Sequence, residues 1–130
     1  MDEIIPNLFI TERLVANNLP EDAYRVLLLS LTPLKREHVH VAVDDAVPWS
    51  CEMLQFIVDT ISEWLADGEC VCVACDAGIS RSAGAVTAYL VSQGMDVDGA
   101  LRLVKSKRSI TKPHPLIVES IIRCSSQKKD

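Results

Sequence analysis

The chain has 130 residues, of which 48% are hydrophobic and 5% aromatic, and its formal net charge is −5 at pH 7. This length and composition predict one globular domain, over residues 1–130, with a hydrophobic core of its own. The acidic balance argues against a nucleic-acid-binding protein and against binding to an anionic membrane surface, so we expect neither partner.

The start of the chain and its cysteine content predict a compartment. No apolar run is long enough to span a bilayer, and the acidic start Met1-Asp2-Glu3 is unlike a signal peptide. The chain has five cysteines, an odd number, and no secretory signal. We therefore expect reduced thiols in a cytoplasmic protein.

Hydrophobic patterns predict strands and turns in the first third of the chain. Residues 4–10 are typical of a short edge strand, because they contain a proline, and residues 11–17 of a helical turn. The nearly continuous apolar run at 24–31 indicates a strand that is buried on both faces. After a solvated link at 35–37, the alternation over residues 38–43 places three valines on one face of another strand.

The rest of the chain is mainly helical in pattern. Ser50 is a suitable N-cap for a helix that ends at Asp67, before Gly68, and apolar residues recur along this helix at helical spacing. The pattern then predicts a strand at 70–75 and a helix at 83–93. Asp96 is a suitable N-cap for a helix over 97–107. Pro113-His114-Pro115 begins a last helix that ends at Cys124, and residues 125–130 form a polar tail.

Strands that alternate with helices predict an α/β layer fold. We expect a central, mostly parallel, twisted sheet of four to five strands, with helices on both faces. Ligand sites in such sheets lie at the carboxyl ends of the strands. Cys75 and the Asp44–Asp45 pair both follow predicted strands. They are therefore expected to share one edge of the sheet.

The segment from Cys75 to Ser82 joins a predicted strand to a predicted helix. A loop that leads into a helix presents free backbone N–H groups and the positive end of the helix dipole, which favour a bound anion. The same groups would favour a thiolate at Cys75, and the guanidinium of Arg81 can form paired hydrogen bonds with a phosphate. This loop is therefore suited both to bind an oxyanion and to attack it.

These residues resemble the signature of the cysteine-dependent protein tyrosine phosphatase superfamily, Cys-x5-Arg-Ser/Thr between a strand and a helix. The segment Gly78-Ile79-Ser80-Arg81-Ser82-Ala83 is similar to the dual-specificity branch in particular. One position departs from the family pattern, because Ala74 stands where a histidine usually precedes the nucleophile. We therefore expect the Cys75 thiol to ionise less readily than in relatives that have the histidine, without loss of activity.

The resemblance implies a role for each residue of the signature. Cys75 would be the nucleophile, Ser82 would donate its hydroxyl to the thiolate, and Arg81 would bind the phosphoryl oxygens. The backbone N–H groups that would bind the phosphate belong to Asp76, Ala77, Gly78, Ile79, Ser80 and Arg81.

The general acid is expected on the loop that leaves the strand at 38–43. In the family this aspartate lies roughly thirty residues before the nucleophile, after an alternating apolar pattern. The segment Val41-Ala42-Val43-Asp44-Asp45 places Asp45 at that point, so Asp45 is favoured and Asp44 is the alternative.

The resemblance implies a protein phosphatase that acts on phosphotyrosine and on phosphoserine or phosphothreonine, without a metal or cofactor. A phosphate-binding module without turnover and an RNA or nucleotide phosphatase remain alternatives. The run of Cys70, Cys72 and Cys75 also leaves open a zinc site, completed by Cys51 or Cys124, or a disulfide to Cys75 under oxidation. The sequence does not determine the oligomeric state.

Overall fold

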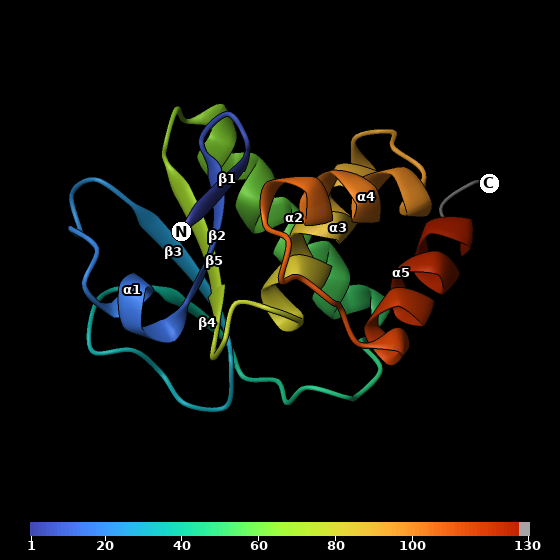
Figure 1. The fold of residues 1–130 in the computed structure, drawn as a ribbon, viewed down its shortest axis with the longest axis horizontal. Helices are drawn as coiled ribbons and strands as arrows, with labels where there is room; N and C mark the ends of the chain where they lie inside the picture. The colour runs from blue at the N-terminus through green and yellow to red at the C-terminus, as the bar shows by residue number, and fades with distance from the viewer. Residues whose placement is uncertain (128–130) are drawn as a thin grey trace.

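The computed structural model describes residues 1–127, which form a five-stranded sheet and five helices (Figure 1). The strand order is β1-β2-β5-β3-β4, and every neighbouring pair is parallel except β1 and β2. This confirms the predicted mostly parallel sheet. The strands are β1 (Asp2–Ile5), β2 (Leu8–Glu12), β3 (Arg25–Leu29), β4 (Val39–Val41) and β5 (Val71–Cys75).

The N-terminal segment is a hairpin, so the prediction of one edge strand over residues 4–10 was wrong. Pro6 and Asn7 form the turn between β1 and β2, and Asn7 adopts a φ of 69°. Asparagine tolerates this left-handed conformation better than most residues do. The hairpin places β1 at the edge of the sheet and lets β2 pair with β5.

Four of the five helices cover one face of the sheet, and the short α1 lies on the other side (Figure 1). Ser50 caps α2 by accepting a hydrogen bond from the N–H of Met53, and Asp96 caps α4 through the N–H of Gly99. Both caps were expected from the sequence. The helices are α1 (Arg13–Asn17), α2 (Cys51–Ala66), α3 (Arg81–Ser92), α4 (Val97–Lys107) and α5 (Pro115–Gln127).

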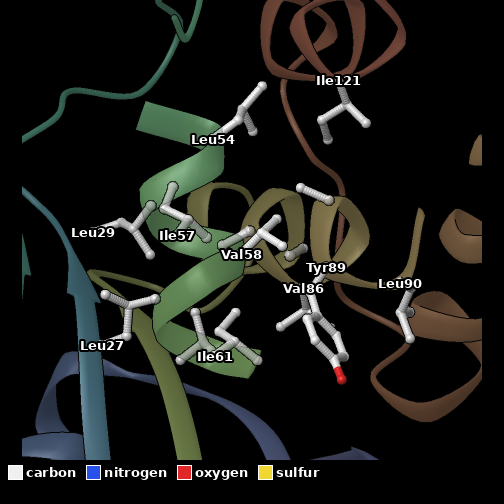
Figure 2. Packing of buried hydrophobic residues seen from close by; sticks show 14 of the residues in the cluster. Leu27, Leu29, Leu54, Ile57, Val58, Ile61, Val86, Tyr89, Leu90 and Ile121 are labelled. Carbon is white, nitrogen blue, oxygen red and sulfur yellow. The ribbon is translucent and has the colours of Figure 1, made fainter. Parts of the chain in front are cut away.

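The alternation of side chains along the strands divides the buried residues between two clusters. Leu27 and Leu29 of β3 belong to the main core, where they lie beside Ile57 and Ile61 of α2 (Figure 2). The intervening residues Val26 and Leu28 pack into a smaller cluster with Ala16 of α1. The same alternation in β5 directs Val71 and Val73 to the main core and Cys72 and Ala74 to the smaller cluster. Cys75 is therefore expected on the face that carries α3.

The cysteines do not all remain as free thiols. Cys51, at the start of α2, and Cys124, in α5, form a disulfide whose Cα atoms are 5.5 Å apart. The prediction of five reduced thiols was wrong for this pair, because the packing of α5 against α2 joins residues that are 73 positions apart. Among residues 1–127 no group of three histidine, cysteine or acidic side chains is placed to hold a metal ion.

Two local predictions were also wrong. Arg36 was expected in a solvated link, but it is buried and donates hydrogen bonds to the backbone carbonyls of Leu19 and Tyr24. The polar tail begins later than expected, because α5 continues to Gln127; residues 128–130 lie outside the described part. No helix in that part is long and apolar enough to cross a membrane.

Candidate active site

The signature segment lies at the carboxyl end of β5, between two parallel neighbours in the sheet. Cys75 is the last residue of β5, residues 76–80 form a loop, and Arg81 begins α3. Gly78 occupies the middle of the loop with a φ of 67°, a conformation that glycine adopts without strain. The predicted strand, loop and helix are therefore confirmed.

Three carbonyl groups of the loop accept hydrogen bonds from donors outside it. In an extended or turning backbone, a carbonyl and the next N–H point in roughly opposite directions. Carbonyls that are held on the outside therefore turn the following N–H groups toward the inside of the loop. The three bonds run from the N–H of Arg13 to the oxygen of Asp76 (3.3 Å), from Nε of Arg108 to that of Gly78 (2.9 Å), and from the N–H of Lys112 to that of Ile79 (2.8 Å).

The backbone N–H groups of residues 76–81 donate no hydrogen bond to any other atom of the described chain. In a folded protein such donors are normally paired with protein, water or a ligand. Six consecutive unpaired N–H groups at the start of a helix are therefore suited to bind an anion.

Cys75 and Ser82 lie together at the base of the loop. The Sγ atom of Cys75 is 3.2 Å from the Oγ atom of Ser82, and both residues are buried. Ala74, where the family pattern has histidine, is buried in the cluster beneath α1, on the opposite face of the sheet. The sulfur is thus in hydrogen-bonding contact with a hydroxyl.

Arg81 is buried and links two parts of the site. Its Nη1 atom donates to the backbone oxygen of Val43 at 2.9 Å, and its Nη2 atom donates to the carboxylate of Asp76 at 3.1 Å. The first bond fixes the start of the loop that carries Asp44 and Asp45. The second leaves the guanidinium charge partly neutralised by a carboxylate.

Asp76 is surrounded by hydrogen-bond donors. Its carboxylate accepts from the hydroxyl of Ser30 at 2.7 Å, from the guanidinium of Arg13 at 3.0 Å and from Arg81. Partial burial alone would raise the pKa of Asp76, but these three hydrogen bonds outweigh it and lower the pKa. Asp76 is therefore ionised at neutral pH and stands beside the anion site.

The two candidate acids lie in different surroundings. A carboxylate oxygen of Asp45 accepts from the hydroxyl of Ser80, in the loop, at 2.8 Å, whereas Asp44 is exposed and accepts from the N–H of Asp45. The hydroxyl of Ser80 also accepts from the N–H of His114 at 2.9 Å. The structure thus brings Asp45 to the loop. Within residues 1–127, the carboxylate of Asp44 accepts a hydrogen bond only from the N–H of Asp45.

Three residues that hold the loop were missed by the sequence reasoning. Arg13 lies within the helical turn predicted at 11–17, and Arg108 and His114 follow the helix predicted at 97–107; the sequence patterns assigned none of the three to the site. Arg108 is buried and pairs with Asp2 at 2.9 Å while it donates to the loop. A local pattern cannot reveal such contacts, because each one joins segments that are far apart in the sequence.

Comparison with known proteins shows the family to which the chain belongs. A family model described as dual specificity phosphatase, catalytic domain, matches residues 14–127. Human dual specificity protein phosphatase 16 is 42% identical over 69 residues, which are 52% of this chain and 10% of that protein. This chain therefore spans about a tenth of the human relative.

A second relative covers nearly the whole chain. The putative tyrosine phosphatase 123R of Invertebrate iridescent virus 6 is 29% identical over 126 residues, which are 92% of this chain and 87% of the viral protein. The crystal structure of a mouse putative dual specificity phosphatase complexed with zinc tungstate has the same fold, with a TM-score of 0.85 and 26% sequence identity. The match covers 97% of this chain and 86% of the mouse chain.

Human DUSP28 has the same fold, with a TM-score of 0.85 at 20% identity over 98% of this chain and 96% of its own. The family model, which matches residues 14–127, covers the complete segment from Cys75 to Ser82 and both candidate acids. The chain therefore belongs to the dual-specificity phosphatase family of hydrolases, within the cysteine-dependent protein tyrosine phosphatase superfamily.

Proposed function

We propose that this chain hydrolyses phosphotyrosine and phosphoserine or phosphothreonine in proteins, through a phosphocysteine intermediate and without a metal ion. One observation carries the proposal. Three loop carbonyls are bonded to donors outside the loop, the N–H groups of residues 76–81 have no partner in the described chain, and the sulfur of Cys75, where the loop begins, contacts a hydroxyl. A tetrahedral phosphoryl group has the shape and charge that this ring of donors would stabilise.

In the first step the Cys75 thiolate attacks phosphorus. The S–P bond forms as the bond to the leaving oxygen breaks, and Asp45 donates a proton to that oxygen. Arg81 and the loop N–H groups stabilise the charge on the three other oxygens. The contact of Asp45 with the hydroxyl of Ser80 supports its role as the acid, because Ser80 belongs to the loop that would bind the phosphate.

In the second step water attacks the phosphocysteine. Asp45, now ionised, accepts a proton from the water as the P–O bond forms and the S–P bond breaks. Ser82 donates a hydrogen bond to the departing thiolate, and the 3.2 Å separation of Oγ and Sγ supports this role. Inorganic phosphate then leaves, and the starting thiolate is restored.

The charges beside the site favour a phosphomonoester in a protein over a polyphosphate. Asp76 is ionised and adjoins the nucleophile, and the loop from residue 76 to residue 80 contains no lysine. A second phosphate close to the first would be repelled by this carboxylate. For this reason a protein phosphatase is our first candidate function, and a nucleotide or RNA phosphatase is the second.

The test is hydrolysis of phosphotyrosine and phosphoserine peptides by the full chain in the presence of EDTA. We expect phosphate release that is abolished in Cys75→Ser and retained in Cys70→Ser, a control for a free thiol at the other end of β5. A rapid acid quench should trap one phosphoryl group per protein molecule on Cys75. Turnover that survives Cys75→Ser or requires added metal would disprove the mechanism, and phosphate binding without turnover would indicate a binding module.

A further inference from the structure

Exposed apolar side chains occur in the loop of residues 76–80 and in segments that are hydrogen-bonded to it. Large hydrophobic residues are usually buried, and those that gather around a functional site often contact a ligand. Ile79 belongs to the loop itself and is 37% exposed. Leu14, Leu31 and Ile110 are 73%, 60% and 54% exposed and lie in segments that are bonded to the loop. We call these four residues the apolar rim.

Leu14 and Leu31 lie on the side of the site where Asp76 is held. Leu14 follows Arg13, whose N–H donates to the backbone oxygen of Asp76 and whose side chain donates to its carboxylate. Leu31 follows Ser30, whose hydroxyl donates to the same carboxylate. Arg13 also donates to Ser30 at 2.6 Å, so each leucine follows a residue of the same hydrogen-bonded group.

Ile110 lies in the connection between α4 and α5, which runs past the start of α3 (Figure 1). This connection is bonded to the loop at two points. Lys112 donates its N–H to the oxygen of Ile79, and Arg108 donates to the oxygen of Gly78. Ile110 lies between these two anchors in the sequence, so the rim has apolar residues on both the α1 side and the α5 side of the loop.

The charged groups of this region are paired or balanced. Arg13 forms an ion pair with Asp76 at 3.0 Å, and Arg81 forms an ion pair with the same carboxylate at 3.1 Å. Asp76 is itself exposed, but it is paired with both of these arginines. Asp44 and Lys112 are also exposed and have opposite signs. The region therefore offers no strong excess of charge to a flanking acidic or basic residue, and apolar contact is the interaction that it does offer.

We infer that the substrate is a protein segment with large apolar residues on each side of the phosphorylated residue. This inference rests on the proposed phosphatase function, and it adds the class of segment that the site selects. Burial of half an aliphatic side chain against the rim should raise kcat/KM about fivefold for one flank. Two apolar flanks should together exceed a tenfold gain, about 1.4 kcal/mol at least.

The experiment compares three phosphotyrosine peptides that differ only at the two flanking positions, which are leucine, serine or glutamate. We expect kcat/KM to be highest for the leucine peptide and clearly lower for both the serine and the glutamate peptides. The affinities of the three peptides for Cys75→Ser, measured by fluorescence anisotropy, should follow the same order. This binding measurement tests the rim even if turnover is slow.

Two rim variants and one control locate the effect. Leu14→Ser and Leu31→Ser should each reduce the preference for leucine over serine flanks about threefold to fivefold, by loss of one apolar contact. Phe56→Ser should leave the preference unchanged, because Phe56 is half exposed on α2, outside the rim. The preference is a ratio within one variant, so a general loss of activity does not affect it.

The outcomes separate the two proposals. Equal kcat/KM and equal affinity for all three peptides would overturn the inference and leave the phosphatase function intact. A preference for leucine flanks that Phe56→Ser reduces as much as the rim variants would also overturn it. Absence of turnover on every peptide, with leucine-selective binding to Cys75→Ser, would refute the enzyme function and retain the rim as a phosphopeptide-binding surface.

Discussion

The substitution Gly78→Ala tests whether the outward-bonded loop is essential, and Gly68→Ala is its matched control. Both glycines have positive φ, 67° and 79°, so alanine is strained at either position. Their surroundings differ. A Cβ atom at Gly68 would meet nothing within 4 Å, whereas one at Gly78 would lie 2.8 Å from the backbone carbon of Thr11 and 2.6 Å from Nη2 of Arg108.

The expected magnitudes follow from these contacts. Alanine in the left-handed region costs about 1–2 kcal/mol, and the stiffer unfolded chain returns about 0.4–1 kcal/mol. Gly68→Ala should therefore lower the free energy of unfolding by about 1 kcal/mol. Gly78→Ala should lose a further ~1–3 kcal/mol, because the backbone of Thr11 in β2 cannot move aside as the end of a flexible side chain can.

The assays are urea unfolding and hydrolysis of an aryl phosphate, with inhibition by vanadate as a measure of oxyanion binding. A shift of the loop by about 1 Å should reduce kcat/KM of Gly78→Ala about 100-fold. The same assays should find Gly68→Ala close to wild type in kcat/KM and in vanadate affinity. If Gly78→Ala matches Gly68→Ala in both stability and activity, the close contact of the loop with β2 is not what orders the phosphate site.

Four further predictions concern the acid and the cysteines. Asp45→Asn should lower kcat about 100-fold, with vanadate affinity largely kept, whereas Asp44→Asn should change kcat less than about twofold; equal effects would contradict the assignment of the acid. Burial raises the pKa of the Cys72 thiol to about 12, so this residue stays protonated and iodoacetamide at pH 8 should not label it by mass spectrometry. Because the pKa of Cys72 is raised in the folded protein, the protonated thiol contributes to the free energy of unfolding below pH 9, and this contribution is lost as the pH rises toward 12. The difference in unfolding free energy between wild type and Cys72→Ala should therefore be smaller at pH 11 than at pH 7. Cys51→Ser removes the disulfide to Cys124, 73 positions away in the sequence, so the free energy of unfolding should fall by about 4 kcal/mol while kcat is unchanged. If stability is not reduced, the disulfide does not form in solution.

The sequence by itself determined the elements that local chemistry specifies. The cap residues Ser50 and Asp96 begin their helices as expected, because each side chain bonds an N–H three residues ahead. The strand, loop and helix of the signature followed from β-branched residues, a central glycine and an uninterrupted helical run. These features depend on neighbours in the chain, which the sequence displays directly.

The tertiary structure alone decided what holds the site in its working shape. Arg13 belongs to α1, whereas Arg108 and Lys112 belong to the connection between α4 and α5, and only the packing of these two segments against one loop turns its carbonyls outward. Likewise Asp45 is distinguished from Asp44 by a hydrogen bond with Ser80, 35 residues away in the chain. Cys51 forms a disulfide with Cys124 because α2 and α5 pack against each other. Local patterns carry the chemistry of a residue, but hydrogen bonds between distant segments depend on how the sheet and helices pack.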